Sequence, residues 1–205
     1  MLSVSRHPLV RQWLGRLRDV NTPPREFRTL VHDLALLLIV EATTDLPLAP
    51  YALETPLGAT RGERLGETVA FVPILRAGLG MVPAAEQLFP DAPIWHLGLY
   101  RDEQSLRPVE YYNRLSRFVP CDRCLVLDPM LATGGSAAAA IALIRSFGTP
   151  RVGLISIIAA PEGVAVENAF PDVAIQVAAL DERLNDHGFI VPGLGDAGDR
   201  QFGTR

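Results

Sequence analysis

The chain of 205 residues contains no lysine, and all 19 of its basic residues are arginine. This absence excludes Schiff-base catalysis by lysine, the lysine of a P-loop and the strand lysine of protein kinases. Any phosphate that the protein binds must therefore be held by arginine side chains, backbone amides or a metal ion.

Long apolar runs are also absent. The most apolar segments, Leu34–Val40 and Ala137–Ile144, are far shorter than the roughly 20 residues that a membrane-spanning helix needs. The segment Met1–Val10 has no apolar stretch long enough for a signal peptide. We therefore expect a cytoplasmic protein that makes no contact with a membrane.

Cysteine is rare, and its two copies, Cys121 and Cys124, form an isolated C-x-x-C motif. A zinc site would need two further ligands at suitable spacing, but the four histidines are scattered along the sequence. Redox pairs usually lie where a strand ends and a helix begins, whereas Cys124 starts a predicted strand. We expect two reduced thiols and assign them no function.

The chain carries more negative than positive charge, and its formal net charge is -4. This balance argues against a nucleic-acid partner bound through a broad basic surface. A small anionic ligand remains compatible, because a few arginines can converge locally. The hydrophobic share of 48% and the length predict one globular domain over residues 1–205.

The order of the apolar segments predicts an α/β fold. Two helices come first, at His7–Val20 and at about Phe27–Ala42, and the second is apolar on most faces, which suggests contact with the core or with another subunit. From Thr68 onward, short apolar strands alternate with helices, which indicates a mainly parallel sheet covered on both faces. The predicted strands are Val69–Leu75, Ile94–Tyr100, Cys124–Leu127, Val152–Ala159 and Val173–Ala179. The predicted helices of this part are Gly80–Leu88, Ser136–Phe147 and Glu162–Ala169.

The predicted core spans about residues 68–180, with the terminal segments 7–42 and 185–205 outside it. Val109–Leu115 alternates and is expected to form part of a hairpin. Asn185–Arg205 has no periodicity, so it is either a long ordered loop or a tail. It includes a literal G-x-G-x-x-G at Gly193–Gly198, but only seven residues follow, too few for a dinucleotide-binding unit.

The segment that carries the chemistry follows the strand that ends at Leu127. Its residues are Asp128, Pro129, Met130, Leu131, Ala132, Thr133, Gly134, Gly135 and Ser136. Ligands of open parallel sheets bind at the carboxyl ends of strands, and glycines let backbone N–H groups converge on an anion at a helix N-terminus. The loop is therefore a candidate monophosphate site, with Asp128 beside the sugar hydroxyls. Spacing alone fits equally well an ordinary strand-to-helix turn with Ser136 as the N-cap.

The residues of this loop resemble the phosphoribosyl pyrophosphate loop of the type I phosphoribosyltransferases. The broad family has two adjacent acidic residues here, whereas Asp128 is followed by Pro129, as in the uracil-specific branch. The resemblance to that branch extends over nearly the whole chain. The further matching segments are Glu41–Thr43, Pro73–Gly80, Leu99–Asp102, Tyr111–Tyr112, Ala159–Gly163 and His187–Asp199.

The resemblance implies the type I phosphoribosyltransferase fold, with a mainly parallel central sheet flanked by helices, a hood built from the terminal segments, and a flap. It implies transfer of the phosphoribosyl group of 5-phospho-α-D-ribose 1-diphosphate (PRPP) to uracil, which gives UMP and diphosphate. Asp128, Arg76 and Arg101 would be the catalytic residues. The loop 128–136 would bind PRPP together with Arg76, Arg101 and Asp196.

The same resemblance implies that uracil is bound mainly by backbone groups of Ile190, Gly195 and Ala197, with Asp196 in the same segment. Mg²⁺ would be the cofactor, held mainly through substrate and water near Asp196. These roles require the loop 128–136 and the C-terminal segment to meet in the folded chain.

Further expectations come with the resemblance. Residues 101–115 would form the flap that excludes water, and the Leu75–Arg76 peptide is expected to be a non-proline cis bond. GTP is a candidate effector, and a homodimer or higher homo-oligomer is expected. Two alternatives stay open: a transferase for a different base, and a non-catalytic nucleotide sensor or RNA-binding regulator on the same fold.

Overall fold

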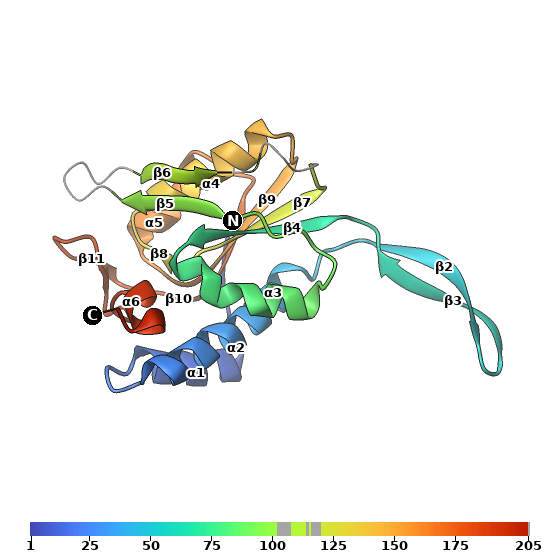
Figure 1. Ribbon diagram of the computed structural model, residues 1–205, viewed down its shortest axis with the longest axis horizontal. Helices are drawn as coiled ribbons and strands as arrows, with labels where there is room; N and C mark the ends of the chain where they lie inside the picture. The colour runs from blue at the N-terminus through green and yellow to red at the C-terminus, as the bar shows by residue number, and fades with distance from the viewer. Residues whose placement is uncertain (102–107, 114, 116–119, 205) are drawn as a thin grey trace.

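The computed structural model of the protein describes residues 1–101, 108–113, 115 and 120–204, and its framework is an eight-stranded sheet (Figure 1). Seven strands form a continuous path in the order β1-β10-β9-β7-β4-β5-β6, and β8 pairs with β9 beside it. The paired strands run parallel except for β5 and β6, which form the predicted antiparallel hairpin. The strands are β1 (Leu2–Val4), β4 (Val69–Leu75), β5 (Leu97–Arg101), β6 (Pro108–Asn113), β7 (Arg123–Leu127), β8 (Met130–Leu131), β9 (Arg151–Ala159) and β10 (Ala174–Leu180).

Helices cover both faces of this sheet, as the near-continuous apolar strands predict. On one face lie α1 (Pro8–Arg18), α2 (Pro24–Ala42) and α3 (Val82–Leu88), and on the other lies α4 (Gly135–Ser146) (Figure 1). Each face has its own cluster of buried side chains, one around Phe27 and Phe71 and the other around Ile141 and Val126. No helix in the described ranges is both long and apolar enough to cross a membrane.

The helix α2 shows why its sequence is apolar on most faces. It begins at Pro24, three residues earlier than expected, because Pro23 and Pro24 are compatible with a helix start. It contacts α1, α3, α6 (Ala197–Phe202), β9 and β10 of the same chain. The apolar faces of α2 are therefore explained within one subunit, and they give no reason to expect a second one.

A β-hairpin that the sequence analysis missed projects from the body of the protein (Figure 1). It consists of β2 (Leu48–Thr55) and β3 (Gly58–Leu65), which pair along their whole length from Leu48–Leu65 to Thr55–Gly58. Most of its residues are exposed, and none is buried. A two-stranded hairpin without a covering layer is marginally stable in water, so this arm is a candidate surface for contact with another chain.

The C-terminal stretch is more regular than expected. Where a structureless loop or tail was predicted, the chain forms a small hairpin of β11 (Arg183–Leu184) and β12 (Ile190–Val191), and then the helix α6. The helix has only six residues, too few for its periodicity to be recognised. The short helices α5 (Pro161–Val164), η1 (Ala77–Met81) and η3 (Ala165–Asn168) complete the fold.

Candidate active site

Arg76 and Asp128 lie at the point in the sheet where the order of the strands changes direction. β4 pairs with β5 on one side and with β7 on the other, and all three strands are parallel. Open α/β sheets bind ligands at the carboxyl ends of the strands at such a point. Arg76 follows the carboxyl end of β4 and Asp128 follows that of β7, so the topology places both at one edge of the sheet.

The loop 128–136 has the geometry of a strand–turn–helix phosphate site. Gly134 is left-handed, with φ of 78°, and a Cβ atom there would lie 2.8 Å from the carbonyl oxygen of Gly163. The helix α4 begins at Gly135, so its free N–H groups and the positive end of its dipole point into the loop. Ser136 lies inside α4 and is not its N-cap, so the alternative of an ordinary Ser-capped turn is wrong.

A cavity of about 170 Å³ joins this loop to the C-terminal segment. The loop contributes Asp128, Met130, Leu131, Ala132, Thr133, Gly134, Ser136 and, from α4, Ala137. The C-terminal segment contributes Gly188, Phe189 and Asp196. The two regions that the sequence analysis requires to meet therefore line one cavity. Gly188 and Phe189 were not among the predicted site residues, although their neighbours were.

Burial is the main influence on the pKa of Asp128. Loss of hydration raises the pKa of its carboxyl group to about 7, against the weaker opposing effect of the Met130 backbone amide. That amide donates to Oδ1 over 3.3 Å. A carboxyl group with this pKa lies between its two protonation states near neutral pH, which is unusual for an aspartate and typical of functional sites.

Arg76 connects the edge of the sheet to the C-terminal helix. The Leu75–Arg76 peptide is cis, so that prediction is confirmed. The Arg76 side chain is 59% exposed and lies 3.7 Å from Oδ1 of Asp199 in α6. The guanidinium group is therefore accessible to an anion from solvent. The backbone of Arg101 ends β5, but its side chain and residues 102–107 of the expected flap lie outside the described residues.

The C-terminal residues predicted for uracil are held by the core. Ile190 and Ala197 belong to the buried cluster, with side chains 4% and 2% exposed. Gly195 has φ of 79°, which favours glycine. Asp196 is the N-cap of α6, where Oδ1 accepts a hydrogen bond of 2.8 Å from the backbone amide of Asp199. At Ile190 and Ala197, burial of the side chain leaves the backbone as the part that could bind a ligand.

Two polar residues that sequence analysis missed fix this segment. Asp181 follows the carboxyl end of β10, and its Oδ2 accepts a bond of 2.9 Å from the Gly193 amide. Arg18 of α1 bridges Asp181 and the carbonyl oxygen of Gly193, each through Nη1 over 2.8 and 2.7 Å. The strand-end rule that found Asp128 could have found Asp181, but no local pattern marks Arg18.

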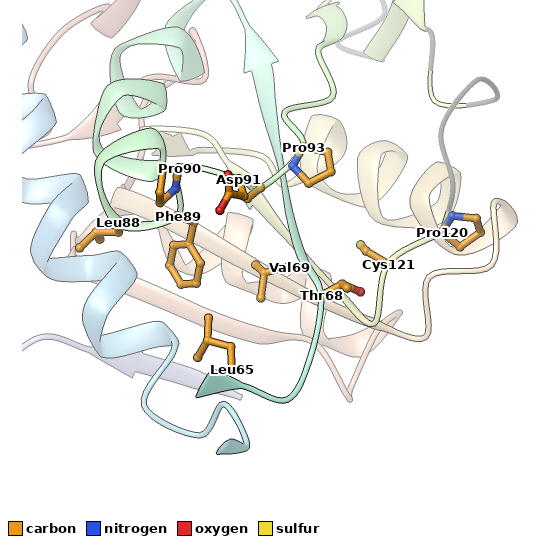
Figure 2. Close-up of a pocket in the computed structure, with 11 residues that line it drawn as sticks. Leu65, Thr68, Val69, Leu88, Phe89, Pro90, Asp91, Pro93, Pro120 and Cys121 are labelled. Carbon is orange, nitrogen blue, oxygen red and sulfur yellow. The ribbon is translucent and has the colours of Figure 1, made fainter. Parts of the chain in front are cut away.

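A larger cavity, about 520 Å³, lies away from these residues (Figure 2). It is lined by apolar side chains of the α3 end and by residues at the start of β4, such as Val69, together with Cys121. Because it opens near the amino ends of β4 and β7, it contains none of the predicted site residues. Cys121 and Cys124 are free thiols, as predicted.

The described residues include no group of three or more histidine, cysteine or acidic side chains that could hold a metal ion. Two carboxylates, Asp128 and Asp196, line the small cavity. Carboxylate oxygens are ligands that Mg²⁺ accepts while it keeps several waters or substrate phosphates. The donor set therefore fits a hydrated ion carried by a phosphorylated ligand better than a dedicated protein cage.

Comparison with known proteins agrees with this geometry. The profile of the family described as uracil phosphoribosyltransferase matches residues 4–204. A uracil phosphoribosyltransferase of Roseiflexus sp. (strain RS-1) is 56% identical over 202 residues, which are 98% of this chain and 97% of the relative. The solved structure of the AQ2163 protein from Aquifex aeolicus has a TM-score of 0.93 at 39% identity and 98% coverage of both chains. A hypoxanthine phosphoribosyltransferase from Staphylococcus aureus shares the fold, with a TM-score of 0.51 at 10% identity over 88% of this chain and 84% of its own.

Proposed function

This chain belongs to the uracil phosphoribosyltransferase family, and from that premise we propose how its residues divide the work of the reaction. The enzyme transfers the phosphoribosyl group of PRPP to uracil and forms UMP and diphosphate. The uracil nitrogen forms a bond to the anomeric carbon while the bond from that carbon to diphosphate breaks. The observation that supports the roles of the loop 128–136 and of Asp196 is the cavity that they share.

The loop binds the 5-phosphate of PRPP, in this proposal. Backbone N–H groups at Thr133 to Ser136 and the amino end of α4 stabilise the phosphate charge. The hydroxyl groups of Thr133 and Ser136 add donors. Asp128, at the head of the loop, accepts hydrogen bonds from the ribose hydroxyls and supplies negative charge close to a sugar that becomes cationic in the transition state.

Arg76 and Arg101 stabilise the diphosphate as it leaves. Arg76 follows the carboxyl end of β4 and Arg101 ends the adjacent parallel strand β5, so their backbones lie at the same edge of the sheet as Asp128. Charge-assisted hydrogen bonds from guanidinium groups strengthen as negative charge develops on the leaving group. Mg²⁺, held by PRPP, water and Asp196, would neutralise part of the same charge.

Uracil is recognised by the main chain of Ile190, Gly195 and Ala197, with Asp196 between them. Backbone N–H and C=O groups in this segment match the acceptor and donor pattern of one uracil edge. Cytosine presents the opposite pattern at its amino group and would leave buried polar groups unpaired. The side chains of Ile190 and Ala197 are buried in the core, which supports recognition by backbone.

The test is product formation from PRPP and Mg²⁺ with uracil, cytosine, hypoxanthine and orotate in parallel. We expect UMP from uracil and little or no nucleotide from the other bases. Failure to form UMP would refute the activity, whereas equal turnover of a purine would refute the proposed base recognition alone.

We propose that the protein is a homodimer or a higher homo-oligomer that uses the β2–β3 hairpin. The arm is largely exposed and carries four exposed large apolar residues. These are Leu48, Tyr51, Leu57 and Leu65, of which Leu57 is fully exposed. Exposed apolar residues of this size on a projecting element favour burial against another chain. Sedimentation analysis of the wild type tests the proposal, and a monomer at all concentrations contradicts it.

Two further proposals follow from family membership. GTP, which activates some members of this family, is proposed as an effector, and initial rates with and without GTP at subsaturating PRPP test it. We also propose a cytoplasmic location, supported by the two free cysteines, because disulfides are rare in that compartment. Fractionation of the native cell checks the location.

A further inference from the structure

Gln201 in α6 is a buried polar residue that connects two parts of the proposed site. Its side chain is 0% exposed. The amide nitrogen Nε2 donates one hydrogen bond to the carbonyl oxygen of Ala77 and one to that of Ala197, each over 3.0 Å. A side-chain amide has two N–H donors, so these two bonds use both of them.

The two acceptor residues belong to different segments of the proposed site. Ala77 directly follows Arg76, the proposed diphosphate ligand, and begins the short helix η1. Ala197 directly follows Asp196 and belongs to the proposed uracil segment. One planar group therefore joins the backbone of the diphosphate segment to the backbone of the uracil segment, although 124 residues separate Ala77 from Gln201 in the sequence.

The environment of the amide allows only this orientation. Its oxygen Oε1 is buried and has no hydrogen-bond partner. This oxygen faces Gly80 of η1, where a Cβ atom would lie 1.6 Å from it. Rotation of the amide by 180° would turn an oxygen toward two carbonyl oxygens, which would repel it. Both N–H donors of the amide are therefore committed to the carbonyl oxygens of Ala77 and Ala197.

We infer that Gln201 is a positioning residue that sets the separation between the diphosphate and uracil segments, and so aligns the attacking nitrogen with the leaving group. This inference rests on the proposed roles of Arg76 and the uracil segment. Reactions between two bound substrates are sensitive to misplacement by about 1 Å, so a change in this separation affects turnover without touching either substrate.

The first test is Gln201→Met, which keeps a side chain of similar length and removes both hydrogen bonds. We expect kcat/KM for both substrates to fall by about 10- to 100-fold, the range expected for two lost hydrogen bonds. Both KM values should rise, because each substrate meets a displaced segment. A residue that only stabilised the fold would instead lower kcat through a smaller active fraction and leave both KM values unchanged.

Arg28→Met is the matched structural control. Arg28 of α2 donates through Nη1 to the backbone carbonyl of Gln201, so it holds the same turn of α6 without contacting Ala77. We expect this variant to lower the melting temperature while kcat/KM stays within about twofold of the wild type. If Arg28→Met lost as much activity as Gln201→Met, the inference would be wrong, because general loosening of α6 would explain both.

A second variant keeps the inference testable if Gln201→Met does not fold. Gly80→Ala places a methyl group against Oε1 and displaces the amide while Gln201 is kept. It should reproduce the rise of both KM values, and in a Gln201→Ala background it should have little additional effect. Additive losses in that double variant contradict the inference. Wild-type turnover of uracil tests the proposed function separately, since all of these outcomes are ratios to the wild type.

Discussion

At the scale of single residues, Asp128 combines two demands that conflict in the free protein. The loop surrounds its carboxyl group with protein, which raises the pKa to about 7, yet the proposed chemistry needs a negative charge beside a cationic sugar. The substrate can reconcile the two, because a bound magnesium ion or a developing cation favours the ionised form. In the free enzyme, the carboxyl group of Asp128 should therefore become negatively charged only as the pH rises.

This leads to a prediction for the pH dependence of turnover. Because the pKa of Asp128 is raised, the carboxylate is lost as the pH falls through about 7. We expect kcat/KM for PRPP to increase with pH and to reach half its plateau near pH 7. In Asp128→Asn that step should disappear, and kcat/KM should fall by about 10- to 100-fold with the loss of a charged hydrogen-bond acceptor. Persistence of the same step in the variant would assign it to another group.

The cysteine pair allows a prediction of thiol reactivity. The interaction with Cys124, and then that with Thr149, lowers the pKa of Cys121 to about 7 against the effect of burial. Cys121 together with burial raises the pKa of Cys124 well above its usual value. Only Cys121 lines the larger cavity (Figure 2).

We therefore expect iodoacetamide to alkylate Cys121 first, with a rate that rises with pH through about 7. Peptide mapping by mass spectrometry identifies the modified thiol. Cys121→Ser should leave Cys124 unmodified until the protein unfolds, and Cys124→Ala, which removes the hydrogen-bond donor, should shift the Cys121 profile to higher pH. Alkylation of Cys124 before Cys121 would contradict the assignment.

At the scale of elements, the sequence predicted the helices and strands whose buried residues form a recognisable apolar pattern. β4 and β7 are buried along nearly all of their length, and their apolar runs were recognised. The β2–β3 hairpin was missed because neither of its faces is buried, so it shows no alternation of apolar and polar residues. The six-residue helix α6 was missed because it is too short to show a period.

In the candidate site, too, local sequence predicted some residues and missed others. Asp128 could be found because it follows a predicted strand, and ligands bind at strand ends. Arg76 was assigned from the resemblance of Pro73–Gly80 to the family's pyrophosphate loop. Arg18 and Gln201 act through hydrogen bonds to residues more than 120 positions away, and such contacts leave no local pattern. The roles assigned to the individual site residues remain predictions.

The loop 128–136 gives a prediction at this scale. Gly134→Ala adds a methyl group at a left-handed position, 2.8 Å from the carbonyl oxygen of Gly163. The loop must shift, and its phosphate-binding amides shift with it, so we expect KM for PRPP to rise by at least about tenfold. Binding of PRPP can be measured directly by calorimetry.

The control for Gly134→Ala is Gly15→Ala in α1, where a Cβ atom meets nothing within 4 Å. This substitution should stabilise the protein slightly, by up to about 1 kcal/mol, and leave PRPP binding unchanged. Normal PRPP affinity in Gly134→Ala would show that the loop amides are not the phosphate ligands.

At the scale of the whole molecule, the N-terminal helices contact the C-terminal segment that contributes to the site. Arg18, near the N-terminus, binds Asp181 and Gly193, and Arg200 lies 4.4 Å from the centre of the Phe27 ring. The C-terminal segment thus depends on contacts with α1 and α2. Its integrity should be coupled to the stability of the complete fold.

A stability measurement tests this coupling. The side chains of Arg18 and Asp181 are only 22% and 4% exposed, so Arg18→Met leaves a buried carboxylate without its partner. We expect the free energy of unfolding to fall by about 3 kcal/mol in urea titrations. The matched variant Arg145→Met breaks the pair with Asp172, whose side chain is 64% exposed, and should cost no more than about 1 kcal/mol. Equal losses would mean that burial of the pair does not matter.

The hairpin β2–β3 also has a consequence for engineering. Its first and last residues, Leu48 and Leu65, are paired at the base, so the polypeptide leaves the body and returns to it at the same place. Eight residues per strand carry the tip about 25 Å outward. A fluorescent reporter inserted beside Leu57 would thus lie at the tip of the hairpin, and the rotational mobility of the reporter would show whether the tip is in contact with another chain.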